Sequence, residues 1–360
     1  MTNKLKILIT GACGVTSRSV VRSLRMSTVF KDTSEFIGTD VCNNWHGIFE
    51  GLYDKIHKVP YYHDKEYRNI MNSIIMENKI DAAIILPDQE VHYWSENPFN
   101  VKFLRIPPRF AWIAFSKRRL YETLKGSGII PHFQIIERNS ILQGTDSIGL
   151  SYPFWMRNCS DGTSCGNGSF CPNNCEEMKA WLTINPHINT FMVSSYLPGR
   201  NFGCFLLYNN GKLLKQGLAW RMDYLLKKTT VSGITGVACK GKLLNSPETV
   251  AVARQAVESI FHKTGEIPNG LMSVDLKEDD SGTPLVTEIN IRHLGFSSIF
   301  ASAGCNFSEY QLLCALGREN EISPELEKIF PANNIMLRDV DGLPIYLEKC
   351  EELEMGKSYS

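Results

Sequence analysis

The sequence predicts a mixed fold in which an α/β unit comes first and an α+β unit follows. In residues 1–112, short apolar strands alternate with segments of helical spacing. Further on, several strands follow one another with only tight turns between them, and two late strands are joined by the polar turn "EDDSG". Alternating strands and helices indicate a parallel sheet, whereas tight turns connect antiparallel strands.

Composition narrows the class of protein. The 360 residues are 43% hydrophobic and 21% charged, which is ample for two or three core-bearing units. A formal net charge of zero argues against a nucleic acid or an anionic membrane as partner. No apolar stretch approaches the roughly 20 residues that cross a bilayer, and the start "MTNKLKILITGACG" has too short an apolar core for a signal peptide. We therefore expect a soluble, cytoplasmic protein.

Cysteine usage fits that compartment. Eleven cysteines is an odd number, scattered through a chain too long to need disulfides, so reduced thiols are expected. Four of them gather in one segment: Cys159, Cys165, Cys171 and Cys175. Their spacing lacks the paired C-x₂-C of common zinc sites, which favours loop cysteines over a structural metal.

The opening unit reads strand, glycine turn, helix and second strand. "KILIT" is followed by "GACG", a helix, and "FIGTD", which ends at Asp40. This order predicts a Rossmann-type unit. Gly11, Gly14 and Asp40 are loosely similar to a dinucleotide fingerprint but lack G-x-G-x-x-G. An NAD(P)-dependent reductase thus remains an alternative, and glycines that serve only the turn are the other reading.

A helix in "FSKRRLYETLKGSGI" is expected to begin at Ser116, its N-cap, and to stop near Gly126. Its first turn carries Lys117, Arg118 and Arg119. Cations there oppose the positive end of the helix dipole, so a bound phosphate would relieve the conflict. We expect Arg118 and Arg119 to extend into water.

The next segment is rich in glycine. A strand "YPFWMRN" carries Arg157 and leads into "CSDGTSCGNGSFC", which holds Ser164, before a helix in "NNCEEMKAWL". Backbone N–H groups of such a loop can wrap phosphate oxygens, with Arg157 supplying charge. The ending of a Walker A loop is absent, and a surface loop is the alternative.

"NTFMVSSYLPGRNFGCFLLYNNGKLLKQGLAWRM" predicts three strands of one antiparallel sheet, with a domain boundary before it. The clearest helix follows in "NSPETVAVARQAVESIFHKTG". Ser246 is its expected cap, Pro247 its first residue, and Gly265 closes it.

Two final strands, "LMSVDLK" and "PLVTEIN", are expected to form a hairpin. Glu288, Asn290 and Arg292 recur at every second position and so share a face, which Asp275 of the partner strand can join. Carboxylate and amide oxygens are ligands that Mg²⁺ accepts. A solvated strand face is the alternative, and His293 should point away from Arg292, towards packing.

At this point the chain resembles the ATP-grasp superfamily, and "VTEINIRHLGFSSIFASAGCNFSEYQLL" resembles its carbamoyl-phosphate-synthetase-like branch. The resemblance follows the family's order over nearly the whole chain. It implies a Rossmann-like pre-ATP-grasp domain at 1–112 and a small ATP-grasp subdomain with a glycine-rich lid at 113–188. A large subdomain with the metal hairpin at 189–320 and a C-terminal segment at 321–360 complete it.

The resemblance also implies roles for residues. The implied metal ligands are Asp275, Glu288 and Asn290; the implied nucleotide residues are Lys117, Arg157, Ser164, Ser195, Tyr196, Leu197 and Asn201; the implied catalytic arginines are Arg292 and Arg221. Arg292 would contact phosphate or acyl phosphate, and Arg221 the substrate carboxylate. Arg157 stands in the place of a lysine, Asn201 in that of a ribose-binding glutamate, and the acid expected near Ser194 or Ser195 is missing.

The implied reaction is an ATP- and Mg²⁺-dependent ligation, with Mn²⁺ as a possible substitute. A small carboxylate, with an amino acid as the favoured type, becomes an acyl phosphate that an amine attacks, and ADP is released. The missing acids leave a non-catalytic nucleotide sensor as an alternative. A homodimer is a base-rate expectation.

Overall fold

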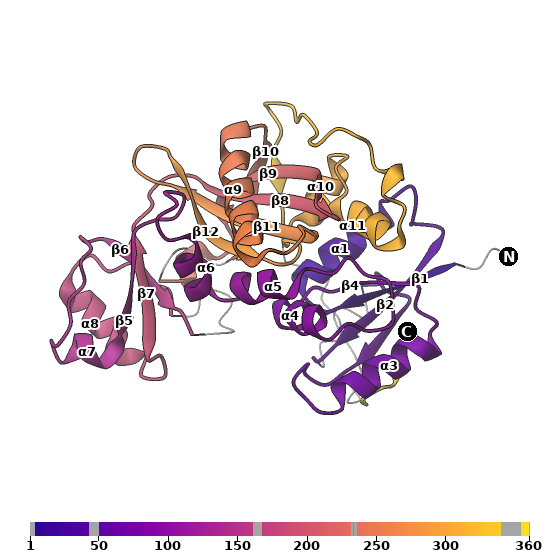
Figure 1. Cartoon of the computed structure of the whole chain (residues 1–360), viewed down its shortest axis with the longest axis horizontal. Helices are drawn as coiled ribbons and strands as arrows, with labels where there is room; N and C mark the ends of the chain where they lie inside the picture. Colours follow the sequence, from indigo (N-terminus) through magenta and orange to yellow (C-terminus); the bar gives the residue numbers. More distant parts are fainter. Residues whose placement is uncertain are drawn as a thin grey trace.

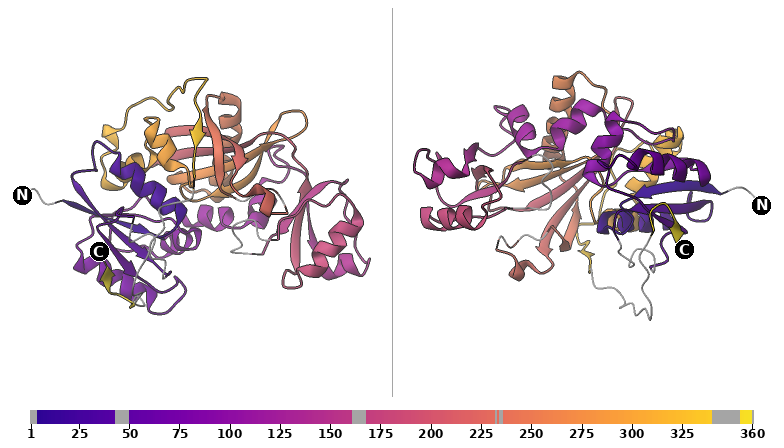
Figure 2. Two further views of the ribbon diagram at one scale, coloured as in Figure 1. Left: turned by 180° about the vertical axis from the view of Figure 1, so that it is seen from behind. Right: turned by 90° about the horizontal axis from the view of Figure 1, so that it is seen from below.

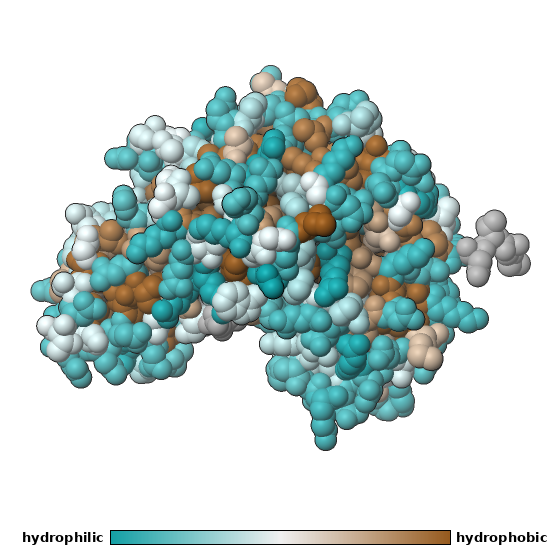
Figure 3. Space-filling view, viewed as in Figure 1, coloured by the Kyte–Doolittle hydropathy of each residue, from teal (hydrophilic) through white to brown (hydrophobic). Residues whose placement is uncertain are grey.

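The computed structural model describes residues 4–42, 50–160, 168–231, 233, 236–339 and 354–359. Three sheets follow one another along the length of the molecule, and the elements carry the labels of Figure 1. The two views of Figure 2 show the small sheet at one end, the N-terminal sheet at the other and the largest sheet between them. The surface is hollowed on one side between the two end lobes (Figure 3).

The N-terminal sheet has the order β14-β3-β2-β1-β4, with β1 to β4 parallel. Its elements are β1 (Leu5–Thr10), α1 (Val15–Arg25), β2 (Ser34–Asp40), β3 (Lys55–Lys58), α3 (Tyr67–Glu77), β4 (Ala82–Ile84) and α4 (Asp88–Glu96). This confirms the predicted α/β unit. The short strand β14 (Ser358–Tyr359) adds an antiparallel edge from the far end of the described chain.

Asp40 holds the turn between β1 and α1. Its Oδ2 accepts from the Cys13 amide at 2.8 Å and its Oδ1 from the Cys42 amide at 2.8 Å. Gly11 has φ +63°, and a Cβ there would meet Cγ of Pro87 at 2.8 Å, so the turn requires glycine. Gly11 and Asp40 of the loose fingerprint therefore have structural roles of their own, and these two residues give the reductase alternative no support.

Two short helices, α5 (Pro108–Ala114) and α6 (Lys117–Leu124), connect the N-terminal sheet to the rest. Ser116 caps α6 as predicted, because its side chain accepts from the Arg119 amide. Arg118 pairs with Glu122 on the surface, and Arg119 lies over the Trp112 ring.

The small lobe is a three-stranded antiparallel sheet of order β5-β7-β6 with two helices packed against it. Its elements are β5 (Phe133–Glu137), α7 (Arg138–Leu142), β6 (Phe154–Asn158), α8 (Cys175–Ile184) and β7 (Thr190–Ser195). The sequence prediction placed β7 in one sheet with the two strands after it, and this is wrong. β7 pairs instead with β5 and β6, because the turn at Pro198-Gly199 is a crossover between lobes rather than a hairpin.

The large sheet has the order β12-β11-β8-β9-β10-β13. Its elements, with the helices that cover it, are β8 (Asn201–Asn209), β9 (Lys212–Tyr224), β10 (Ala238–Leu244), α9 (Pro247–Thr264), β11 (Gly270–Glu278), β12 (Pro284–Asn290), α10 (Ser297–Ser302), α11 (Phe307–Leu316) and β13 (Met336–Leu337). Alternate β8 residues pack on opposite faces: Leu206 joins the core under α9, and Phe205 packs on Phe300 and Phe307. Both faces are therefore covered, and the edge strand β12 is left to face the small lobe.

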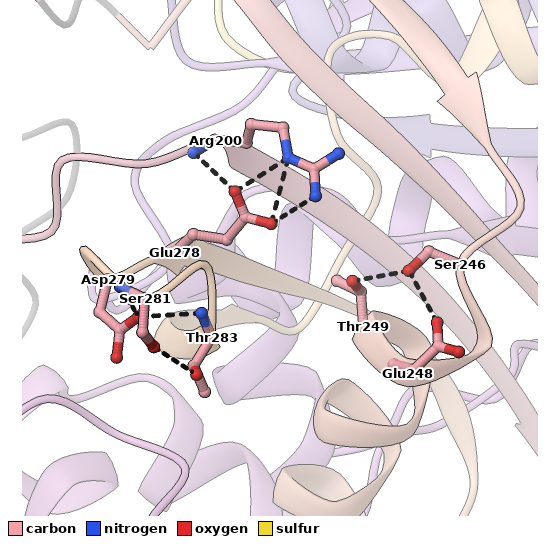
Figure 4. A network of polar contacts seen from close by, with 8 residues as sticks. All are labelled: Arg200, Ser246, Glu248, Thr249, Glu278, Asp279, Ser281 and Thr283. Carbon is pink, nitrogen blue, oxygen red and sulfur yellow. Dashed lines mark hydrogen bonds and ion pairs between the residues drawn. The ribbon is translucent and has the colours of Figure 1, made fainter.

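Helix α9 begins at Pro247, and Gly265, which adopts φ +68°, closes it at its C-terminus, as the sequence predicts. Ser246 does not cap a backbone amide; its hydroxyl contacts Thr249 and Glu248 instead (Figure 4). Within the part of the chain that the structure describes, no helix is long and apolar enough to cross a membrane.

Candidate active site

The hairpin of β11 and β12 places the predicted metal ligands on one face. Asp275 lies directly opposite Glu288, and Asn290 lies opposite Ser273 two positions further on. Side chains opposite each other in a sheet have Cβ atoms about 5 Å apart. A register shift after Asp275 leaves Thr287 unpaired as a bulge. The predicted hairpin is thus confirmed, and three oxygen donors share one of its faces.

The carbonyl freed by this bulge has a partner from the small lobe. Nη2 of Arg157, on β6, donates to the Thr287 carbonyl oxygen at 3.0 Å, and its guanidinium lies 5.2 Å from the centre of the Tyr121 ring. Arg157 is buried at 7% exposure. The bulge therefore anchors a cation from the facing lobe beside the hairpin.

Lys117 brings a second cation to the same face. Its Nζ lies 3.1 Å from Oε1 of Glu288, and the lysine side chain is 10% exposed. Burial raises the pKa of Glu288, but the charges of Lys117 and Arg157 outweigh it and hold that pKa below its usual range. Glu288 is therefore ionised at neutral pH.

Arg221, on β9, reaches across β8 to the hairpin. Its Nη2 lies 2.6 Å from Oδ1 of Asp275, and its Nη1 donates to Oδ1 of Asn201 at 3.0 Å. Burial raises the pKa of Asp275 and Arg221 opposes that rise. The side chain crosses over Gly203, where a Cβ would stand 2.8 Å from Nη2.

Arg292 follows β12 and contacts the N-terminal domain. Its Nε lies 2.9 Å from Oδ2 of Asp88 at the start of α4, and its Nη2 approaches Oδ1 of Asn290 at 3.5 Å. Its Nη1 donates to the His293 carbonyl oxygen. A residue 204 positions away in the chain thus orients this arginine.

These groups line one cavity of about 430 Å³ between the small and large lobes. The crossover from β7 to β8 forms its far wall, with Ser194, Ser195, Tyr196, Leu197 and Asn201. Of the predicted site residues, all but Ser164 lie on this cavity. Ser164 and Cys165 lie outside the described residues.

The crossover itself is tied to the end of β11. The Gly199 amide donates to the Glu278 carbonyl oxygen at 3.0 Å, and the Glu278 amide donates to that of Arg200 at 3.0 Å. Figure 4 shows the Arg200 guanidinium facing the Glu278 carboxylate, at 2.6 Å between Nη2 and Oε1. The crossover that lines the cavity and the β11–β12 hairpin are therefore joined.

No protein-family model matches the chain, and a search of curated protein sequences also finds no match. Solved structures do match. An L-amino acid ligase from Bacillus licheniformis is 15% identical, with 90% of this chain and 78% of that chain covered and a TM-score of 0.63. Carboxyaminoimidazole ribonucleotide synthase from Aspergillus clavatus, complexed with ATP, is 13% identical over 94% and 82% of the two chains, with a TM-score of 0.66.

Phosphoribosylamine–glycine ligase from Thermotoga maritima is 17% identical, with 89% of this chain and 78% of that chain covered and a TM-score of 0.63. Structural similarity over most of each chain, at such low sequence identity, establishes the fold alone. The chain has the ATP-grasp fold. The fold predicted from the sequence is thereby confirmed.

In this ATP-grasp fold the hairpin's donor set fits Mg²⁺. Two carboxylates and one amide supply only hard oxygen atoms. Arg221 and Lys117 now balance the negative charges of Asp275 and Glu288, and a bound metal ion would balance the same charges. Among the described residues no group of three or more His, Cys, Asp or Glu is arranged to hold a metal ion. The described cysteines of the 159–175 segment therefore form no such group.

Sequence reasoning missed three charged residues that line the cavity: Asp88, Lys277 and Arg338. Lys277 alternates with Asp275 on β11 and could have been found by the strand period. Its Nζ lies 5.2 Å from the centre of the Tyr196 ring, and burial lowers its pKa. Asp88 and Arg338 come from distant segments and carry no local signal.

His293 packs away from the cavity, as predicted. It is fully buried, with Nε2 2.7 Å from Oε1 of Gln311 and Nδ1 3.0 Å from the Ser297 hydroxyl. Burial lowers the pKa of His293 to about 3. The ring is therefore neutral at physiological pH and braces the segment that follows Arg292.

Proposed function

We propose that this protein is an ATP- and Mg²⁺-dependent ligase that converts a small carboxylate to an acyl phosphate and couples it to an amine, releasing ADP and phosphate. One observation carries the proposal: Lys117, Arg157 and Arg292 meet the oxygen donors of the hairpin on one cavity between two lobes. Similar solved structures include two ligases that use amino acids by name and one synthase bound to ATP.

The nucleotide lies along the cavity from the crossover to the hairpin. Backbone groups of Ser195, Tyr196 and Leu197 pair with the adenine edge, and Asn201 faces the ribose. Arg221 donates to the amide oxygen of Asn201, so the Asn201 NH₂ group is the part of that side chain that would donate to a ribose hydroxyl. This arrangement supplies hydrogen bonds without the charge of the missing glutamate.

The phosphates lie beside Lys117 and Arg157, whose charges neutralise the transferring phosphoryl group. Asp275, Glu288 and Asn290 would hold Mg²⁺, which would offset the negative charge of the phosphates. Arg292 steadies the acyl phosphate through N–H groups that Asp88 and the backbone orient. No protein nucleophile is required, because the substrate carboxylate attacks the γ-phosphate directly.

The test is quantification of ADP, AMP and phosphate after incubation with Mg²⁺-ATP and pools of small carboxylates, with and without amines. We expect carboxylate-dependent ADP. Asp275→Asn and Glu288→Gln should each lower kcat by about 100-fold or more, since each removes charge from the metal set.

Asp280→Asn is the matched control, because Asp280 lies in the exposed turn of the same hairpin. Its activity should equal that of the parent protein. Formation of AMP would contradict phosphoryl transfer to the carboxylate, and full activity of Glu288→Gln would contradict the assigned metal site.

A non-catalytic nucleotide sensor is the second candidate, favoured by the short Arg221–Asp275 contact of 2.6 Å that occupies one metal ligand. A sensor would bind ATP without carboxylate-dependent turnover. The same assay, combined with ATP-binding calorimetry, separates the two functions.

A further inference from the structure

Lys277 brings a cation to the crossover end of the candidate active site. It lies two positions after Asp275 on β11, and both side chains line the cavity. Its Nζ lies 5.2 Å from the centre of the Tyr196 ring, on the crossover from β7 to β8. The ammonium group is therefore held beside the wall to which we assign the base of the nucleotide.

The register of the large sheet sets Lys277 beside the residue that we assign to the ribose. Lys277 lies directly opposite Asn201 on β8, and side chains opposite each other in a sheet have Cβ atoms about 5 Å apart. Asn201 in turn accepts from Arg221 at 3.0 Å. The lysine side chain therefore extends from the ribose residue to the crossover.

The carboxylates of this cavity are paired with other cations. Among the described residues that line it they are Asp88, Asp275 and Glu288, and each lies 3.1 Å or less from a side-chain nitrogen of an arginine or lysine. Within the described part of the chain, Lys277 has its ring contact with Tyr196 and no hydrogen bond or ion pair. Burial lowers the pKa of Lys277, so a hydrogen-bond acceptor at its ammonium group would be favourable.

The crossover backbone can pair with more than one kind of base. Among the described residues, the backbone groups of Tyr196 and Leu197 form no hydrogen bond, so each residue offers one N–H donor and one C=O acceptor to a ligand. Such a backbone can meet a base edge that donates or one that accepts. The choice between bases therefore falls to side chains, and the ammonium group of Lys277 supplies donors alone.

Purines differ at the position that a lysine can read. Next to the N7 acceptor, adenine carries a 6-amino group, which donates, whereas guanine carries a 6-oxo group, which accepts. Hypoxanthine, the base of inosine, has the same 6-oxo group. An ammonium group can therefore bond O6 and N7 of a 6-oxopurine together, whereas adenine offers it N7 alone on this edge.

We propose that Lys277 reads the 6-position of the purine, and that the site binds 6-oxopurine nucleotides, those of inosine and guanosine, at least as tightly as adenine nucleotides. This inference rests on the proposed function for the use of a nucleoside triphosphate, and it widens the phosphoryl donor beyond ATP. Lys277 is a specificity residue in this account, because it contacts the base and not the transferring phosphoryl group.

The test is calorimetric titration of the full chain with ADP, IDP and GDP in the presence of Mg²⁺, because diphosphates bind without turnover. ADP and IDP differ at the 6-position and in the proton on N1, and GDP adds a 2-amino group to IDP. We expect IDP to bind at least as tightly as ADP. The change in the ratio of the two dissociation constants when Lys277 is substituted isolates the contribution of the lysine.

Lys277→Met removes the donors and keeps an unbranched side chain. It should weaken IDP about tenfold relative to ADP, because the contact with O6 is lost. Lys277→Arg retains donors that can bond O6 and N7, and it should keep most of the preference. Lys212→Met is the matched control, since Lys212 is exposed at the start of β9 in the same sheet, and its ratio should equal that of the parent protein.

Three results would overturn the inference. The first is a parent protein that binds ADP ten or more times more tightly than IDP. The second is a ratio that stays unchanged in Lys277→Met, which includes an equal loss of affinity for both nucleotides and would make the lysine a contact of the ribose or phosphates. The third is absence of binding by all three nucleotides, which would also contradict the proposed function.

The other outcomes separate the inference from the proposed function. Carboxylate-dependent ADP release by a protein that excludes IDP would leave the ligase standing and remove the inference. IDP binding that depends on Lys277, without carboxylate-dependent turnover of ATP, ITP or GTP, would leave the inference standing and contradict the ligase.

Discussion

Gly203 allows the Arg221 guanidinium to cross β8 and reach Asp275. A Cβ at this position would stand 2.8 Å from Nη2 of Arg221, 2.9 Å from Leu294 and 3.0 Å from Phe296. Gly203 has no left-handed backbone angle, so the requirement is for space alone. A single missing side chain therefore sets the position of a buried cation next to a candidate metal ligand.

Gly203→Ala should lower the free energy of unfolding by about 1–3 kcal/mol, because the added methyl group overpacks a buried site. It should also reduce carboxylate-dependent ADP formation, since Arg221 must shift away from Asp275. Urea denaturation and the ADP assay measure the two effects. Gly149→Ala is the control: its Cβ would meet only Oε1 of Gln134, at 3.8 Å. Equal stability of the two variants would contradict this account of Gly203.

At the scale of elements, the crossover from β7 to β8 matters because it joins the two lobes and lines the candidate active site. Its backbone bonds to Glu278 hold it against the end of β11. A Cβ at Gly199 would lie 2.5 Å from Cβ of Glu278, which shows how closely the two segments approach. The Arg200–Glu278 pair closes this contact, with the Glu278 side chain 7% exposed.

Glu278→Gln should therefore lower the free energy of unfolding at pH 7 by about 1 kcal/mol. The expected loss is small because the Arg200 side chain is 50% exposed and water screens its charge. The pKa of Glu278 is lowered by its hydrogen bonds to Arg200. A carboxyl group whose pKa is lower in the folded than in the unfolded protein adds stability above its unfolded pKa. That stability is lost as the pH falls through the folded pKa. The difference from the parent protein should thus shrink below about pH 4.

Urea unfolding at pH 7 and at lower pH tests this expectation. Glu321→Gln removes the same charge from an exposed pair with Arg318, and its stability should not change. A difference for Glu278→Gln that grows as the pH falls would contradict the assigned sign.

At the scale of the whole molecule, much of the site was predictable from local patterns. The period of two placed Glu288 and Asn290 on one face, and a short polar turn brought Asp275 beside them. The assignment of β7 to the wrong sheet shows the limit of local patterns. A Pro-Gly pair in the sequence occurs both in hairpin turns and in crossovers between sheets, so it does not tell which strands pair. Asp88 and Arg338 were missed because only tertiary packing brings them to the cavity.

The Asp88–Arg292 pair is the clearest of these long-range contacts. It joins the start of α4 to the end of the β11–β12 hairpin, and its side chains are 17% and 21% exposed. Because Arg292 also lines the candidate active site, the pair ties the position of α4 to that cavity. We interpret Asp88 as a positioning residue, which acts by holding the Arg292 guanidinium in place.

Asp88→Asn should lower kcat for ADP formation about tenfold or more, with a smaller change in the KM for ATP, because the residues that we assign to the nucleotide are untouched. A double-mutant cycle with Arg292→Met measures the coupling. We expect a coupling free energy of about 1–3 kcal/mol in the activation barrier, since the two side chains share one contact. Glu96→Gln, at the exposed end of α4, controls for charge and should leave kcat unchanged. Additive effects of Asp88→Asn and Arg292→Met would show that Asp88 acts independently of the arginine and would remove its positioning role.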